Sequence, residues 1–190
     1  MDESSRGTKP MNSCRSRSKK QTGCNRWSTI CSSSLLWKQG PSPLSPLIRS
    51  IIQQLRSLPS FASIPLHAVL PDEDIECEGD QGQFKQILTN LIMNSSAAGA
   101  TEVAVDAAVA GVDIIIEVRD NGGGSRESEV PFIFERYYRG SSRRKKKQGL
   151  GLGLPLSRLL ARANGGDLVL HATSEADAVF RLSLPKPPAP

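Results

Sequence analysis

The sequence predicts an α+β fold, a two-layer sandwich in which a mixed, mostly antiparallel sheet carries about three helices on one face. The patterns between residues 47 and 185 follow the order helix, strand, helix, strand, strand, helix, strand, strand. A chain of 190 residues is long enough for one such domain and short for two. Apolar stretches run for only about four or five residues, so no segment could cross a membrane.

The first half of the predicted domain has two helices separated by a strand. Apolar residues recur at helical spacing over residues 46–58, and an alternating pattern over 63–70 predicts a strand. The strongest helical pattern covers 80–98, with Asp80 as N-cap and Gly99 as terminator. The inward-facing positions of the two helices are Leu47, Ile48, Ile51, Ile52, Leu55 and Leu58, then Phe84, Ile87, Leu88, Leu91, Ile92 and Ser95.

The second half contains two strand pairs and one helix. Ala110-Gly111 is the predicted turn of the first strand pair. Residues 125–148 are irregular and increasingly basic. A helix then begins in the run from Gly149 to Gly153 and ends at Gly165-Gly166, with Leu156, Leu159, Leu160 and Ala163 on one face. The four strands are expected over residues 101–109, 112–120, 168–172 and 178–184.

Charge is distributed unevenly along the chain. The net charge is +5, but residues 1–71 carry 10 basic residues against two acidic ones, whereas residues 72–190 carry 14 basic against 17 acidic. The predicted domain is therefore not basic, and we expect no nucleic acid partner. The four cysteines, Cys14, Cys24, Cys31 and Cys77, show no CxxC spacing, so neither a zinc site nor a disulfide framework is expected and a reducing compartment is the default.

Residues 1–46 are rich in Ser, Arg and Lys and lack helical or strand periodicity, so we interpret them as a disordered basic arm. We expect the domain over 47–185 and a tail over 186–190. The acid-poor composition from Met11 onward also fits an organelle transit peptide, and a third alternative is that the segment is not native coding sequence. The expected location is cytoplasmic, or the plastid if the arm is a transit peptide.

Three amide side chains lie on one side of the 80–98 helix. Gln86, Asn90 and Asn94 are spaced four residues apart, so they line up along the helix. Amide oxygens one turn apart suit a hard cation such as Mg²⁺, which takes its other ligands from water and phosphates. The alternative is an ordinary polar helix face.

Asp120 ends a buried strand pattern and is followed by glycines at 122, 123 and 124. A carboxylate at a strand end can accept a hydrogen bond from an exocyclic amine, and glycines let a flat ring approach the backbone. A tight Asp-Asn-Gly turn is the alternative interpretation.

The run GLGLGL at 149–154 alternates glycine and leucine directly before a helix. Glycines give phosphate oxygens access to backbone N–H groups, and a helix N-terminus adds the positive end of its dipole. The run is neither a Walker A loop nor a dinucleotide-binding fingerprint, because no GK[ST] follows and no strand precedes it. A flexible hinge is the alternative.

These stretches together resemble a known family. In order and spacing, QILTNLIMNSS, DNGGG, IFERYYRG and GLGLGL resemble the N, G1, F and G2 boxes of the ATP-binding domain of histidine protein kinases, within the superfamily of gyrase, Hsp90, histidine kinase and MutL ATPases. The resemblance covers about residues 47–185, and it implies the Bergerat-type ATP-binding fold with ATP and Mg²⁺ as cofactors.

The resemblance also assigns residues. Asn94 matches the metal-ligating asparagine and Asn90 the asparagine near the phosphates, which makes these two the expected catalytic residues. Asp120 matches the carboxylate that reads the adenine amino group, with Gly122 and Gly124 beside the base. The lid-to-helix junction around the triphosphate comprises Gly149, Leu150, Gly151, Leu152, Gly153 and Leu154. The F box, which packs the base of the lid, contains Phe132, Phe134, Tyr137 and Tyr138. The basic lid residues beside the nucleotide are Arg139, Arg143, Arg144, Lys145, Lys146 and Lys147.

Two features depart from the family pattern. The family commonly follows the metal asparagine with Ala and then a basic residue on the next turn. Here Asn94 is followed by Ser95, Ser96, Ala97 and Ala98, so we expect one phosphate contact to be missing. The lid between Arg139 and Gly149 is short.

The expected function is transfer of the ATP γ-phosphate to a histidine on a separate or missing dimerisation domain, in two-component signalling with a response regulator. Family members that hydrolyse ATP carry a glutamate where this sequence has Asn90, which cannot act as a general base. His67 and His171 both fall on predicted strands, so phosphorylation within the chain is not expected, and we expect a monomer. The alternatives are a Ser-directed regulator and an ATP-binding module that transfers nothing.

Overall fold

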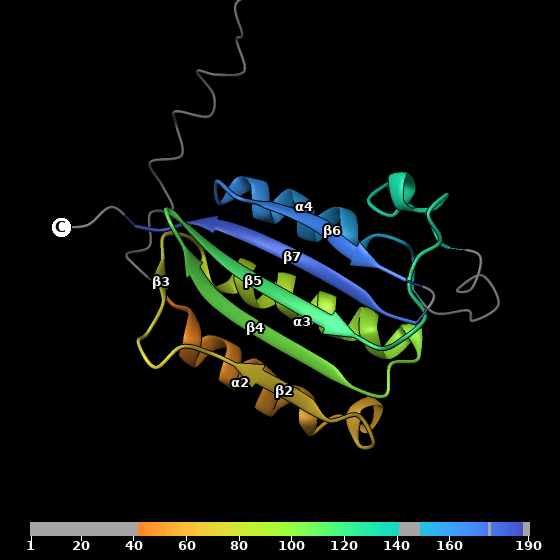
Figure 1. Cartoon of the computed structure of the whole chain (residues 1–190), viewed down its shortest axis with the longest axis horizontal. Coiled ribbons are helices and arrows are strands. Elements are labelled where there is room, and N and C mark those ends of the chain that lie inside the picture. Colours follow the sequence, from red (N-terminus) through yellow and green to blue (C-terminus); the bar gives the residue numbers. More distant parts are fainter. Residues whose placement is uncertain (1–41, 141–148, 175, 188–190) are drawn as a thin grey trace, which may run out of the picture. The chain divides into compact units, whose positions relative to one another are not determined.

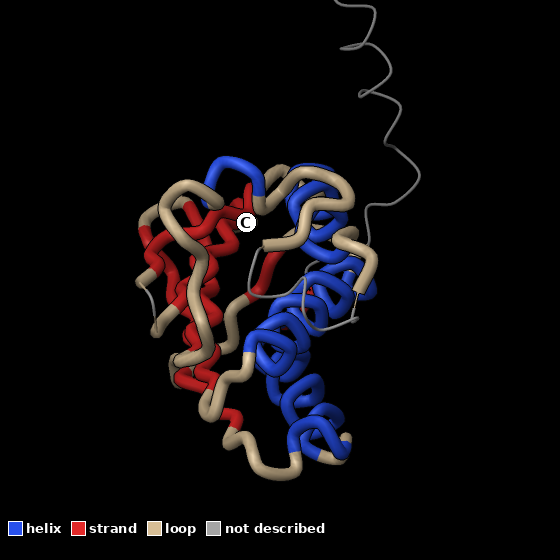
Figure 2. The backbone as a smooth tube through the Cα atoms, turned by 90° about the vertical axis from the view of Figure 1, so that its right-hand side faces the viewer, coloured by secondary structure: helices blue, strands red, loops and turns tan. Residues whose placement is uncertain are grey.

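The computed structural model describes residues 42–140, 149–174 and 176–187. Within them the main sheet has five strands in the order β2-β4-β5-β7-β6, with β2 parallel to β4 and all other neighbours antiparallel. Figure 1 and Figure 2 show the α-helices gathered on one face of this sheet. The predicted two-layer α+β sandwich is confirmed. The elements are β1 (Ser42–Pro43), α2 (Leu44–Arg56), η1 (Pro59–Phe61), β2 (Leu66–Val69), β3 (Glu76–Cys77), α3 (Gln81–Ala98), β4 (Val103–Ala110), β5 (Asp113–Asp120), η2 (Val130–Phe132), α4 (Gly153–Ala163), β6 (Asp167–Thr173) and β7 (Ala178–Pro185).

The core lies between the helices and the inner face of the sheet. The inward stripe of α3 is completely enclosed, since its five apolar side chains are each at most 1% exposed. Alternate residues of β4 and β5 meet this stripe, as the two-residue period of a strand requires. Burying each such side chain stabilises the fold by about 1.5–3 kcal/mol. The five α3 residues are Phe84, Ile87, Leu88, Leu91 and Ile92.

The first helix differs from its predicted range of 46–58. It begins at Leu44, because Pro46 lies in the first turn, where backbone N–H groups have no partner within the helix. It ends at Arg56, and Leu58 is 39% exposed rather than part of the buried stripe. Of the predicted arm and tail, residues 1–41 and 188–190 lie outside the described residues.

The strand predicted over 63–70 is shorter, because the turn that follows η1, with a hydrogen bond from Ile64 N to Phe61 O, extends into its first residues. β1 and β3 were not predicted, because two-residue strands are too short to show a period. The first hairpin turns at Gly111-Val112 rather than Ala110-Gly111, because Ala110 still pairs with Asp113 and Gly111 adopts φ +65°.

The ends of α3 are as predicted. The Asp80 side chain accepts a hydrogen bond from Gln83 N at 2.8 Å, and Gly99 adopts φ +89°, a left-handed conformation that favours glycine. The Asn164 side chain, just beyond α4, accepts from Asp80 N at 3.1 Å and donates to Gln83 Oε1 at 2.8 Å. The beginning of α3 is therefore tied to the end of α4.

Charged side chains line the outer face of the sheet. Glu117 accepts hydrogen bonds from Arg181 at 2.7 Å and from Arg119 at 2.6 Å, and Arg119 also reaches Asp106 at 3.1 Å. Arg181 Nη2 donates to His171 Nε2 at 2.6 Å. Burial pushes the pKa of Glu117 up, but the two arginines outweigh it, so that the pKa is lowered overall. This row of charges crosses β4, β5, β7 and β6.

Two further predictions can be compared with the described residues. Cys77 is buried and makes no disulfide, and burial raises the pKa of its thiol to about 12. The other three cysteines lie outside the described residues. No helix in the described part of the chain has the length and apolar character needed to cross a membrane.

Candidate nucleotide-binding site

The three amides of α3 have different surroundings. Gln86 is exposed, whereas Asn90 and Asn94 are half-buried on the following turns. Asn90 Nδ2 donates to Gly153 O at 2.8 Å and to Ser157 Oγ at 3.1 Å. Asn90 therefore joins the middle of α3 to the first turn of α4, and its amide oxygen remains as the atom suited to a cation.

Asp120 lies at the end of β5, next to the last turns of α3. Its side chain is held on both oxygens, because Oδ2 accepts from Ser95 Oγ at 2.8 Å and Oδ1 accepts from Gly122 N at 3.0 Å. The residue is only 7% exposed. A carboxylate has about four lone-pair sites, so two positions remain for donors of a ligand.

The glycines after Asp120 lie close to other backbone. A Cβ on Gly122 would come within 3.0 Å of both Ala100 N and Asp120 Oδ1. A Cβ on Gly124 would lie 2.0 Å from Ser174 O, in the connection between β6 and β7. Packing therefore requires glycine at 124 and leaves little room for a Cβ at 122, and the expected contact of both with the base stays a prediction.

The three glycines of the run at 149–154 differ in backbone conformation and in the space around them. Gly149 and Gly151 adopt φ +82° and +70°. A Cβ on Gly151 would lie 2.6 Å from Tyr138 O, and a Cβ on Gly153 would lie 3.0 Å from Asn90 Oδ1. Of the leucines between them, Leu150 and Leu152 are exposed and Leu154 is half-buried.

The beginning of α4 offers backbone donors. Its N-cap residue is Leu152, and no side chain caps this end of the helix. The first N–H groups of an α-helix have no partner within it and carry the positive end of the dipole. Gly153 and Leu154 therefore present N–H groups suited to phosphate oxygens, at the position where the sequence predicted triphosphate binding.

The F box packs as a unit beside this run. The Phe132 and Tyr138 rings lie 5.9 Å apart between centroids, and Tyr137, at φ +65°, donates from its backbone N to Gly151 O at 3.0 Å. The Arg158 guanidinium lies 4.7 Å from the centroid of the Phe134 ring. The F box is thus joined to both the glycine run and α4.

Arg158 belongs to a charged cluster that the sequence did not reveal. Arg158 Nε and Arg162 Nε each lie 3.0 Å from Asp167 Oδ1. The hydrogen bond from Arg158 is the main reason that the pKa of Asp167 is well below its usual range, and burial opposes it. A spacing of four residues between the two arginines was the available signal, but it did not indicate a partner on β6.

Two predicted features are only partly tested. Arg139 is half-buried, and the other basic lid residues, 143–147, lie outside the described residues. Within the described ranges, no group of three or more His, Cys, Asp and Glu side chains is arranged to hold a metal ion. The neutral amide oxygens of Asn90 and Asn94 fit Mg²⁺, which prefers oxygen ligands and retains water and phosphate ligands.

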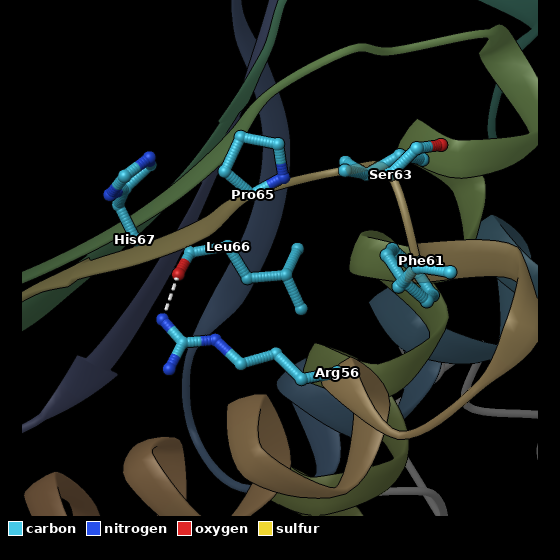
Figure 3. Close-up of a pocket in the computed structure, with 8 residues that line it drawn as sticks. Arg56, Phe61, Ser63, Pro65, Leu66 and His67 are labelled. Carbon is cyan, nitrogen blue, oxygen red and sulfur yellow. Dashed lines mark hydrogen bonds between the residues drawn. The ribbon is translucent and has the colours of Figure 1, made fainter.

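Two hollows in the described part of the surface lie away from these residues. A cavity of about 450 Å³ lies between the end of α2 and β2 (Figure 3), where Arg56 Nη2 donates to Leu66 O at 2.5 Å. Phe61, Pro65 and His67 also line it. A second cavity of about 410 Å³ lies between α2 and the beginning of α3. Neither contains a predicted site residue, so we assign the site from its donors and acceptors rather than from its concavity.

Comparison with known proteins identifies similar domains. Residues 79–188 match the family described as histidine kinase-, DNA gyrase B-, and HSP90-like ATPase. The signal transduction histidine-protein kinase AfsQ2 of Streptomyces coelicolor is 37% identical over 135 residues, which cover 68% of this chain and 25% of AfsQ2. The chain thus spans about a quarter of the length of this relative.

Solved structures show the same fold. The ATP binding domain of PrrB from Mycobacterium tuberculosis matches with a TM-score of 0.63 and 25% identity, over 77% of this chain and 96% of PrrB. ShkA, solved at full length in complex with AMPPNP, matches with a TM-score of 0.65 and 25% identity, over 77% of this chain and 31% of ShkA.

Proposed function

This chain belongs to the histidine kinase-, DNA gyrase B- and HSP90-like ATPase family, and we propose that it binds Mg-ATP and transfers the γ-phosphate to a histidine of a partner domain. The observation that carries this proposal is the Asp120 carboxylate, buried at a strand end and held by Ser95 and Gly122. ShkA, a similar protein, was crystallised with the ATP analogue AMPPNP.

Each part of the site has a task in this proposal. Asp120 accepts an N–H of the adenine amino group, which orients the base. The first N–H groups of α4 donate to phosphate oxygens, and Asn94 offers its amide oxygen to Mg²⁺. When bound, Mg²⁺ neutralises phosphate charge and makes the γ-phosphorus a better electrophile. The site positions the triphosphate in this way for in-line attack by an imidazole nitrogen, with ADP as leaving group.

Transfer is favoured over hydrolysis because of Asn90. An amide cannot take a proton from water, and the Asn90 nitrogen is already hydrogen-bonded to Gly153 and Ser157. We infer that Asn90 acts by fixing the first turn of α4 beside the phosphates. Its catalytic role is therefore positional.

The acceptor histidine is expected on another chain or on a part of the protein outside this sequence. The sequence has two histidines. His67 on β2 lies 3.5 Å from Glu102, and His171 on β6 accepts a hydrogen bond from Arg181. Exposed apolar side chains of the F box and α4 provide a surface for a helical acceptor domain. They include Phe132 (50% exposed), Leu156 (42%) and Leu159 (59%).

The physiological setting that we propose follows from this reaction. A phosphorylated acceptor would pass its phosphoryl group to a response regulator, and the chain alone would be monomeric and cytoplasmic. A mature N-terminus near residues 40–46, determined by mass spectrometry, would instead indicate a cleaved targeting segment.

The test is incubation of the full chain with γ-labelled ATP, Mg²⁺ and a supplied helical acceptor hairpin. Acid-labile label on a histidine of the hairpin supports the proposal. Acid-stable label would indicate a Ser-directed kinase, and ATP binding without transfer would indicate a regulatory module. Asp120→Asn is the control, because label that persists in this variant would not come from the proposed site.

A further inference from the structure

Ser95 is buried at the contact between α3 and the end of β5. The residue is 1% exposed, and its Oγ lies 2.8 Å from Asp120 Oδ2 and 3.3 Å from Leu91 O. A serine hydroxyl has one proton and can donate it to one acceptor at a time. The shorter bond to the charged acceptor is the stronger of the two, so the proton points to Asp120.

The carboxylate of Asp120 is consequently held at two points. Ser95 donates to one oxygen, and the Gly122 backbone N–H donates to the other. The torsion that turns a carboxylate about its Cβ–Cγ bond is broad, so two donors on opposite oxygens determine the plane of the group. The lone pairs that remain point in fixed directions toward any ligand.

We propose that Ser95 is a positioning residue that makes the site selective for 6-aminopurine over 6-oxopurine nucleotides. This inference rests on the proposed nucleotide site at Asp120. A 6-amino group donates to the fixed carboxylate, whereas a 6-oxo group brings a second acceptor against it. The hydroxyl of Ser95 is committed to Asp120 and so does not offer a donor to a 6-oxo group.

The same contact gives a role to one departure from the family pattern. Ser95 stands directly after Asn94, where the family commonly has alanine. In the structure Ser95 faces Asp120, whereas Ser96 Oγ donates to Ser60 O at 3.3 Å. The two adjacent serines therefore form a matched pair, of which one contacts the proposed base-reading carboxylate.

The experiment measures dissociation constants of the full chain for ATP and for inosine triphosphate, which replaces the 6-amino group with an oxygen. In Ser95→Ala, we expect ATP affinity to fall about tenfold, the usual scale for one hydrogen bond to a charged group, and the affinity for inosine triphosphate to change much less. The preference for ATP should therefore fall by a similar factor. Ser96→Ala should leave both affinities unchanged.

A second variant separates the hydroxyl from the volume of the side chain. Ser95→Cys keeps nearly the same size but donates weakly, so it should lose the preference for ATP as Ser95→Ala does.

The outcomes distinguish this inference from the proposed function. Wild-type protein that binds no ATP would overturn the proposed function and the inference with it. Wild-type protein that binds ATP, together with a Ser95→Ala variant that weakens both nucleotides equally or neither, would overturn the role of Ser95 alone. Thermal unfolding of each variant shows whether an equal loss comes from misfolding, which would also count against a role in base selection.

Discussion

Asp120→Asn is the most direct test of the site, because the substitution keeps the size of the side chain and removes its charge. Asparagine can still accept from Gly122 N through its oxygen while its amide nitrogen donates to Ser95 Oγ. The Ser95 hydroxyl can in turn donate to Leu91 O, which lies 3.3 Å away. The fold should therefore tolerate the change.

The nucleotide should bind far more weakly to this variant. It loses the hydrogen bond from the adenine amino group to a charged acceptor, worth about 1.5–3 kcal/mol. The new amide N–H at position 120 also faces the amino N–H of the base, and leaving both donors unpaired costs about a further 1–3 kcal/mol. The sum of about 2.5–6 kcal/mol corresponds to at least about a fiftyfold loss of affinity, at 1.4 kcal/mol for each factor of ten. Binding would then be undetectable at ordinary concentrations.

Titration calorimetry with ATP and Mg²⁺ provides the measurement. Asp106→Asn is the matched control, since Asp106 lies on β4, is 30% exposed and contacts Arg119 on the outer face of the sheet. It should bind ATP as the wild type does. ATP affinity that is unchanged in a folded Asp120→Asn variant would refute the assignment of Asp120 to the base.

Three other predictions concern the metal, the glycine run and the charged cluster. Asn94→Ala should weaken ATP binding on the order of tenfold with Mg²⁺ and little in EDTA, and an equal loss in both would contradict a metal role. Gly151→Ala should lower the unfolding free energy more than Gly149→Ala does, because only at Gly151 would the added Cβ meet backbone. Each substitution costs about 1–2 kcal/mol for placing an alanine at positive φ, and equal losses in the two variants would count against this packing. Asp167→Asn should cost about 1 kcal/mol at pH 7, because the carboxylate is 36% exposed and its ion pairs are screened. Since the pKa of Asp167 is lowered in the folded protein, the carboxylate adds to the free energy of unfolding above its unfolded pKa of about 4, and this contribution is lost as the pH falls below that value. The difference in unfolding free energy between wild type and variant should therefore shrink from about pH 5 to pH 2 in denaturant titrations. A constant difference would contradict the pairing.

Much of the fold was predictable because its elements are long and regular. The inward stripe of α3 repeats over about three turns, and the helix is bounded by residues with clear capping chemistry, Asp80 and Gly99. The sequence could not reveal β1 and β3, which depend on pairing between segments more than 30 residues apart. The position of the first hairpin turn was wrong by one residue, because Gly111 can occupy either central position of a two-residue turn.

The site was predictable to a different extent. Asp120, Asn90 and the glycine run could be proposed from the sequence because their residue types and spacing indicate nucleotide chemistry, and their assignment to the nucleotide stays a prediction. The bonds that hold them could not, because Ser95 appears in the sequence as an inward-facing helix position and Arg158 as an ordinary surface charge. Their partners Asp120 and Asp167 are brought to them by the packing of helices on the sheet. Sequence spacing contains no signal for such contacts.

The two asparagine bridges have a mechanical consequence. Asn90 fastens one end of α4 to α3 and Asn164 fastens the other, so neither helix can slide lengthwise past its neighbour without breaking hydrogen bonds at both places. The two contacts are separated by the length of α4, which is about 16 Å at 1.5 Å per residue. A displacement of α4 along its axis at Gly153, where the phosphates are expected, would therefore also have to break the hydrogen bond at Asp80.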